Sequence, residues 1–117
     1  MKVLGLVWVG TRTGAFAETT AFFRDVMGLA VHSSEPDFEV LELPDGATVE
    51  VFGPSSSWNA HLEHPVAGFR VEDLGEAERD LREAGAEIVL PRQGGVDRGW
   101  LHFRAPDGFV YELAWHR

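Results

Sequence analysis

Two stretches of the sequence, ELPDGATVEVFG (Glu42–Gly53) and RAPDGFVYELAW (Arg104–Trp115), carry nearly the same phrase. Glu50 and Glu112 are 62 residues apart, and the two Pro-Asp-Gly triplets keep the same offset. Asp and Gly favour tight turns, so each triplet is predicted to join two short strands. The sequence therefore indicates an internal duplication, with a glutamate at the same place on the last strand of each copy.

The same offset aligns LGLVWVGT (Leu4–Thr11) with VAGFRVED (Val66–Asp73). Each apolar run is followed by a segment in which apolar or small side chains recur every three to four residues before a glycine. This is the pattern of an amphipathic helix and its stop. The predicted inner stripes are Phe16, Thr20, Phe23 and Met27 in the first copy and Leu74, Ala77, Leu81 and Ala84 in the second.

Three short strands are predicted after each helix. They are Ala30–Ser33, Phe38–Leu43 and Thr48–Phe52 in the first copy, and Glu87–Leu90, Trp100–Arg104 and Val110–Trp115 in the second. Each copy is thus a βαβββ module, and the predicted fold class is α+β. The expected organisation is one domain, with module one at 1–53, a linker at 54–64 and module two at 65–117. One helix covers only one face of a sheet, so the two modules are expected to pair with their helices outside.

Composition narrows the possible partners. The chain has 117 residues, with 10 basic against 19 acidic side chains and a formal net charge of −9. Such a charge repels nucleic acid and anionic membranes and favours cationic or neutral small molecules. The absence of cysteine excludes disulfides and thiolate metal sites and suits a reducing compartment, so a cytoplasmic protein is expected.

Several motifs in register, AFFRDVMGL, PDG…VE, FRVEDL…LREAGAEIV and FRAPDGFVYEL, resemble the glyoxalase, bleomycin-resistance and extradiol-dioxygenase superfamily, also called the vicinal oxygen chelate proteins. The resemblance covers nearly the whole chain. It implies two βαβββ modules whose mixed sheet rolls into a bowl around a ligand cavity, with the helices outside. It also implies a homodimer, as in many members of the family.

The resemblance further implies where a metal site would lie. Metal enzymes of this family place ligands near the start of the first strand and on the last strand of each half. In this chain those positions are Leu4, Val66, Glu50 and Glu112. Leucine and valine have no donor atoms, and zinc, nickel or iron sites favour the imidazole nitrogens that this set lacks. No metal and no other cofactor is therefore predicted.

Side chains alternate along a strand, so the two glutamates fix which residues face the predicted cavity. The predicted ligand-binding residues are Trp8, Glu50, Phe52, Arg70, Trp100, His102 and Glu112. Other roles stay open for them. The tryptophans could simply fill the bowl, the charged residues Glu50, Arg70 and Glu112 could form an internal ion cluster, and His102 could be structural. The segment 91–100, PRQGGVDRGW, is interpreted as a mobile connection that could also gate the cavity.

The leading interpretation is a metal-independent protein of the glyoxalase/bleomycin-resistance type that sequesters a partly aromatic, cationic or neutral compound. The alternative is a glyoxalase-like isomerase or lyase, or a dioxygenase-related enzyme, that acts on a small carbonyl compound by acid-base chemistry. Its catalytic candidates are Glu50, Glu112 and His102, because two carboxylates in an apolar cavity favour a shared proton near neutral pH. A homodimer with a small-molecule ligand is expected in either case.

Overall fold

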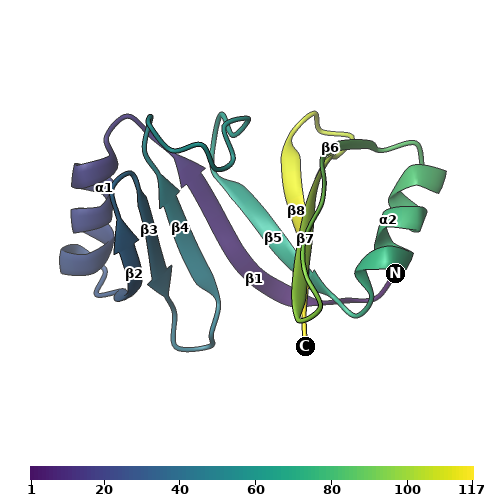
Figure 1. Cartoon of the computed structure of the whole chain (residues 1–117), viewed down its shortest axis with the longest axis horizontal. Coiled ribbons are helices and arrows are strands. Elements are labelled where there is room, and N and C mark those ends of the chain that lie inside the picture. The colour runs from purple at the N-terminus through teal and green to yellow at the C-terminus, as the bar shows by residue number, and fades with distance from the viewer. The chain divides into compact units, whose positions relative to one another are not determined.

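The computed structural model describes residues 1–117, which divide into two compact units. The first unit is Trp8–Val66, and the second unit is Met1–Val7 together with Ala67–Arg117. Each unit is built around one βαβββ repeat, except that the first half of β1, residues 3–7, belongs to the second unit. In each repeat the helix packs on one face of its strands (Figure 1). The predicted α+β class and the duplication are confirmed. Neither helix is long and apolar enough to cross a membrane.

The first repeat has the strand order β2-β3-β4-β1. Strands β1 and β4 are parallel, whereas β2–β3 and β3–β4 are antiparallel, so the sheet is mixed. Its elements are β1 (Val3–Arg12), α1 (Phe16–Ala21), the π-helical turn η1 (Phe22–Val26), β2 (Ala30–Glu35), β3 (Phe38–Glu42) and β4 (Thr48–Phe52).

The second repeat has the matching order β5-β8-β7-β6, with β5 parallel to β8 and the other neighbours antiparallel. Its elements are β5 (Val66–Val71), α2 (Leu74–Glu83), β6 (Glu87–Gly94), β7 (Arg98–Arg104) and β8 (Val110–His116).

The repeated Pro-Asp-Gly triplets form the same turn twice. Gly46 has φ +87° and Gly108 has φ +84°, a conformation that favours glycine. In each turn the aspartate, Asp45 or Asp107, accepts a hydrogen bond from the backbone N–H two residues later. The triplet recurs because each turn must hold β3–β4 or β7–β8 in one fixed register.

Helix α2 supplies the core of the second unit. Leu74, Ala77 and Leu81 are buried against Leu101 and Leu113 of the sheet, as the predicted stripe requires. Ala84, the last residue predicted for the stripe, is exposed at the end of the helix.

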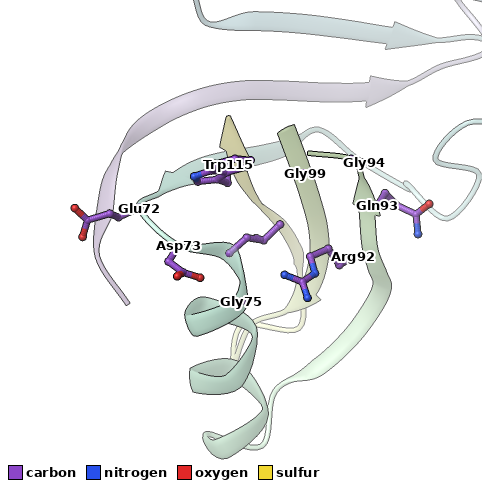
Figure 2. A pocket seen from close by; sticks show the side chains of 10 residues that line it. Glu72, Asp73, Gly75, Arg92, Gln93, Gly94, Gly99 and Trp115 are labelled. Carbon is purple, nitrogen blue, oxygen red and sulfur yellow. The ribbon is translucent and has the colours of Figure 1, made fainter. Parts of the chain in front are cut away.

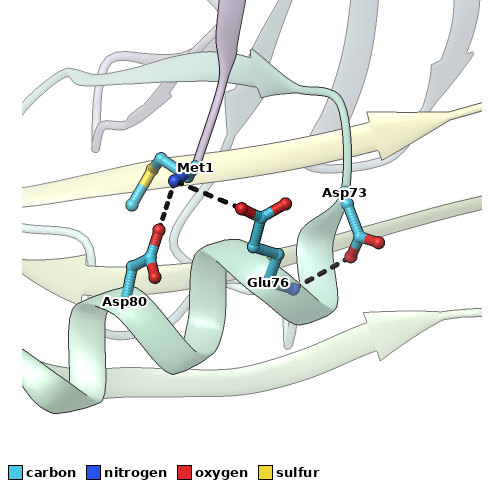
Figure 3. A network of polar contacts seen from close by, with 4 residues as sticks. All are labelled: Met1, Asp73, Glu76 and Asp80. Atoms are coloured by element: carbon cyan, nitrogen blue, oxygen red, sulfur yellow. Dashed lines mark hydrogen bonds and ion pairs between the residues drawn. The ribbon is translucent and has the colours of Figure 1, made fainter.

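Polar contacts hold α2 at its start and on its second turn. The Asp73 carboxylate caps the helix by accepting the N–H of Glu76 at 2.9 Å. The Met1 amino group contacts Asp80 and lies 3.7 Å from a Glu76 oxygen (Figure 3). The hydrogen bond to Asp80 raises the pKa of the Met1 amino group above its ordinary value. These contacts place the start of β1 against α2.

The predicted stripe of the first helix is only partly correct. Thr20 is buried, but Met27 is exposed. The reason is the π-helical turn, in which the N–H of Met27 bonds to the carbonyl of Phe22, five residues earlier. One extra residue in a turn rotates every following side chain, so Met27 leaves the inner stripe. Gly28, with φ +72°, then ends the helix as predicted.

A buried charge replaces an apolar residue in the core of the first unit. Glu39, which is 2% exposed, occupies the position that Leu101 holds 62 residues later. One carboxylate oxygen accepts a 3.0 Å hydrogen bond from Arg24 in the π-helical turn. The other oxygen is buried without a hydrogen-bond partner. The two repeats therefore share a topology but not a core.

The segment 91–100 is more ordered than expected. Its first four residues extend β6 to Gly94 and its last three belong to β7, which leaves three residues at the tip, Gly95 to Asp97. The predicted connection is therefore wrong in its extent, because strands occupy all of the segment except the tip. The chain pairs there because Gly99 and Gly94 allow the two strands to approach closely.

Candidate functional site

The alternation of side chains separates two faces of the second unit's sheet. Val71, Leu101 and Leu113 pack against α2. Neighbouring residues on the same strands, among them Arg70 and His102, therefore lie on the opposite face. Strand pairing gives that face two rows: Gly68, Glu112 and His102 in one, and Arg70, Ala114 and Trp100 in the next.

A buried pair of a histidine and a glutamate lies on this face. The Nε2 of His102 is 2.9 Å from Oε2 of Glu112, and the two side chains lie directly opposite one another on β7 and β8. His102 is 0% exposed and Glu112 is 5% exposed. Gly68 on β5 continues the row without a side chain. The carboxylate therefore fixes the orientation of the imidazole, and the pair is shielded from solvent.

The next row combines a cation with an indole. Arg70 and Trp100 flank the small Ala114, and both are partly buried. The Nη2 of Arg70 donates a long hydrogen bond of 3.4 Å to the His116 carbonyl. Its Nε is buried and has no hydrogen-bond partner. This face can offer a donor and a stacking surface side by side.

The corresponding face of the first unit is built around Trp8. Its indole lies over Gly10, because a Cβ on that glycine would overlap the six-membered ring. Gly10 is paired with Glu50 on β4, which in turn lies opposite Val40 on β3. Trp8 is 7% exposed. The indole and the carboxylate therefore occupy adjoining positions on one face of the first unit.

Phe52, the third residue predicted in the first unit, is almost fully buried. Its ring packs against Phe38, with the two ring centroids 5.0 Å apart. It therefore forms the apolar floor of this face.

The structure groups the predicted site residues by unit. Arg70, Trp100, His102 and Glu112 lie on one face of the second unit, and Trp8, Glu50 and Phe52 lie on one face of the first. The partner of Glu112 is His102. The pairing could have been inferred from the sequence, because a turn that pairs Arg104 with Val110 also pairs the residues two positions away on each side.

The residues present do not fit the metal site of the family. No group of three or more His, Asp or Glu side chains could hold an ion. Leu4 and Val66 contribute no donor atom at the first-strand positions, and Glu112 and His102 are hydrogen-bonded to each other.

A pocket that the sequence did not suggest lies on the α2 side of the second unit (Figure 2). Its volume is about 630 Å³. It is formed by the start of α2, the β6–β7 hairpin and the end of β8. The lining residues are Glu72, Asp73, Leu74, Gly75, Arg92, Gln93, Gly94, Gly95, Gly99 and Trp115. The only signal for this pocket in the sequence is the group of glycines in the hairpin, because residues without side chains leave space beside the backbone.

The chain matches the family model of the Glyoxalase/Bleomycin resistance protein/Dioxygenase superfamily over residues 5–113. It therefore belongs to this superfamily. No curated protein matches the sequence.

Solved structures share the fold. One is a glyoxalase/bleomycin resistance protein/dioxygenase superfamily member from Vibrio splendidus 12B01, with 19% identity, a TM-score of 0.70 and coverage of 97% of this chain and 99% of that one. Methylmalonyl-CoA epimerase from Mycobacterium tuberculosis has 21% identity, a TM-score of 0.71 and coverage of 98% and 89%. An extradiol ring-cleaving dioxygenase from B. fuscum has 20% identity and a TM-score of 0.76, but only 33% of that chain is covered. At these identities the likeness shows the fold alone.

Proposed function

We propose that this protein is a metal-independent small-molecule-binding protein that captures a partly aromatic, cationic or neutral compound on the sheet faces opposite its helices. The observation that carries the proposal is the His102–Glu112 pair. Its two side chains are buried and hydrogen-bonded to each other, so they shape and polarise the face without being exposed to a reacting substrate. A binding role needs a shaped and polar surface but no reactive group in contact with the ligand.

The chemistry of the ligand follows from the residues around the pair. Trp100 in the second unit is only partly buried and offers an indole surface for stacking. In the first unit, Glu50 supplies a carboxylate. It is paired with Gly10, over which the Trp8 indole lies. The net charge of −9 attracts cations and repels anions over a longer range. Aromatic and cationic character together therefore suit this protein best.

The absence of donors at Leu4 and Val66 supports the metal independence of binding. Two carboxylates without imidazole would hold a transition metal weakly, and His102 is engaged with Glu112. Treatment with EDTA should leave ligand affinity unchanged. A loss of binding that is restored by zinc, nickel or iron would contradict this part of the proposal.

A second candidate is a metal-free acid-base enzyme that acts on a small carbonyl compound. The 2.9 Å contact between His102 and Glu112 favours it, because a carboxylate that orients an imidazole is a common acid-base arrangement. The burial of both side chains counts against it, since a substrate proton must come within about 3 Å of the base. Binding without turnover is therefore the better-supported function.

Tryptophan fluorescence separates the two candidates. Bleomycin and a panel of aromatic amines should quench the emission saturably, with no product detected by mass spectrometry. Trp100→Phe should remove part of the quenching, whereas Trp58→Phe, in the linker outside both faces, should not change the affinity. Product formation that disappears in Glu112→Gln would establish the enzyme and overturn the binding protein.

The homodimer remains part of this proposal. Sedimentation velocity at micromolar concentration should give the mass of two chains, and a monomer there would exclude it.

A further inference from the structure

We propose that the pocket between α2 and the β6–β7 hairpin is a second binding site, and that it accepts a small aromatic amino carboxylate, a planar ring that carries both an ammonium and a carboxylate group. This site goes beyond the function proposed above. It lies on the helix side of the second unit's sheet, whereas His102 and Glu112 lie on the opposite side.

Trp115 and Leu74 form the apolar wall of the pocket. Trp115 is on β8 next to Ala114, so its indole points to the α2 side and packs against the core cluster. Leu74 is the first residue of α2 and belongs to the same cluster. Both side chains also line the pocket, and Figure 2 shows the Trp115 ring above the start of the helix. An indole beside an aliphatic side chain is a suitable surface for an aromatic ring.

Two opposite charges flank the pocket on either side of Gly75. A Cβ on this glycine would lie 3.3 Å from the Asp73 carboxylate and 3.4 Å from Nη1 of Arg92. Figure 2 shows the two charged groups reaching toward each other from opposite sides, beneath Trp115. Glycine at this position therefore keeps both groups accessible from the same space.

Each charge retains capacity for a ligand. The protein contact of Arg92 is an ion pair with Glu78 at 3.9 Å, longer than a hydrogen bond, and its side chain is half exposed. Asp73 accepts hydrogen bonds from backbone N–H groups at the start of α2, chiefly that of Glu76, and a carboxylate has room for further donors. A guanidinium can bind a carboxylate through two parallel hydrogen bonds, and a carboxylate can bind an ammonium group.

Four glycines complete the lining, namely Gly75, Gly94, Gly95 and Gly99. They give the pocket room without adding side chains. Gly94 has φ +104°, and a Cβ there would overlap the Arg98 carbonyl, so a larger residue would disrupt the hairpin. The volume of about 630 Å³ lies within the range of about 300–1,000 Å³ that is usual for small-molecule sites.

The paired charges select a zwitterion over a simple ion. A simple anion would meet Asp73 and the neighbouring Glu72, and a simple cation would meet Arg92. A ligand with both charges satisfies both groups at once and leaves neither without a partner. The indole wall then adds the preference for an aromatic ring.

The test is an NMR titration of the uniformly ¹⁵N-labelled protein with three probes of one shape: phenylalanine, phenethylamine and 3-phenylpropionate. Phenylalanine should shift the amide resonances of the four pocket glycines saturably. The two single-charge probes should bind about tenfold more weakly, because each leaves one charged group unsatisfied.

Two variants assign the charges. Asp73→Asn preserves the helix cap, because asparagine caps as well as aspartate, but should remove the advantage of phenylalanine over 3-phenylpropionate. Arg92→Gln should remove its advantage over phenethylamine. Arg104→Gln, at the end of β7 away from the pocket, is the matched control and should leave the three affinities unchanged.

Saturable shifts that follow this pattern establish the site. The proposal is overturned if phenylalanine gives no saturable shift of the pocket glycines, if the three probes bind equally, or if both charge variants behave like Arg104→Gln. Shifts confined to residues around His102 would likewise overturn it and would assign the ligand to the other face of the sheet.

Discussion

Replacing His102 by valine tests the buried acid-base pair most directly. The repeat itself suggests this change, because Val40 holds the corresponding position opposite Glu50 in the first unit. In the variant, Glu112 would stay in a position where it is 5% exposed but would lose the imidazole that lies 2.9 Å away. The carboxylate would then be buried without the hydrogen bond to the imidazole.

The size of the effect follows from these contacts. A hydrogen bond to a charged group contributes about 1.5–3 kcal/mol, and breaking a buried ion pair from one side costs about 3–5 kcal/mol. We expect a loss of about 3 kcal/mol, the value at which these two ranges meet. The second change Glu112→Leu should recover most of this loss, because it removes the buried charge.

Urea unfolding followed by circular dichroism measures the effect. With a urea m-value of about 2 kcal/mol/M, His102→Val should lower the midpoint by about 1.5 M. The double variant should return close to the parent. The reasoning is refuted if the single variant loses less than about 1 kcal/mol, a value ordinary for any core substitution, or if the double variant is no more stable than the single one.

Three further predictions concern other parts of the chain. Gly10→Ala should lower the free energy of unfolding in urea by about 1–3 kcal/mol, because the new methyl group displaces the Trp8 indole. The displaced indole should red-shift the tryptophan emission, and unchanged emission would contradict this. Glu39→Leu introduces the leucine that the second repeat has at the equivalent position 101. It should raise the free energy of unfolding by about 1 kcal/mol, because it removes a buried oxygen without a partner. A loss of stability would show that the ion pair between Glu39 and Arg24 contributes more. The backbone hydrogen bond from Glu76 lowers the pKa of Asp73 below its ordinary value of 3.8, so its contribution to stability is complete above that pH and is lost as the pH falls through the lowered pKa. Acid titration of stability should show this loss in the parent but not in Asp73→Asn, and equal slopes would refute the cap.

The sequence determined the duplication, and through it the topology of each repeat. The 62-residue offset and the Pro-Asp-Gly turns fix which strands are neighbours and in which register. Strand side chains alternate with a period of two, so the placement of Leu101 and Leu113 against α2 could be deduced by counting from Glu112. These features depend on residues that are close together in the sequence and on the two-residue alternation of strands, both of which can be read from the sequence itself.

Other features depended on packing between distant residues. The π-helical turn that exposes Met27 arises from one extra residue in a turn, and the helical period alone does not reveal it. Glu39 was buried in a position where the other repeat has leucine, because Arg24 reaches it from that same turn.

The pocket beside Asp73 and Arg92 was likewise decided by tertiary structure. Its walls come from α2, from the β6–β7 hairpin and from Trp115 at the end of β8, segments whose distances no local pattern specifies. The sequence predicted the helix after Asp73 and the strand that carries Trp115, but it assigned Arg92 to a connection, whereas the structure has it in β6. Only the folded chain brought a carboxylate, a guanidinium and an indole around one space, because that arrangement depends on how the helix packs on the sheet.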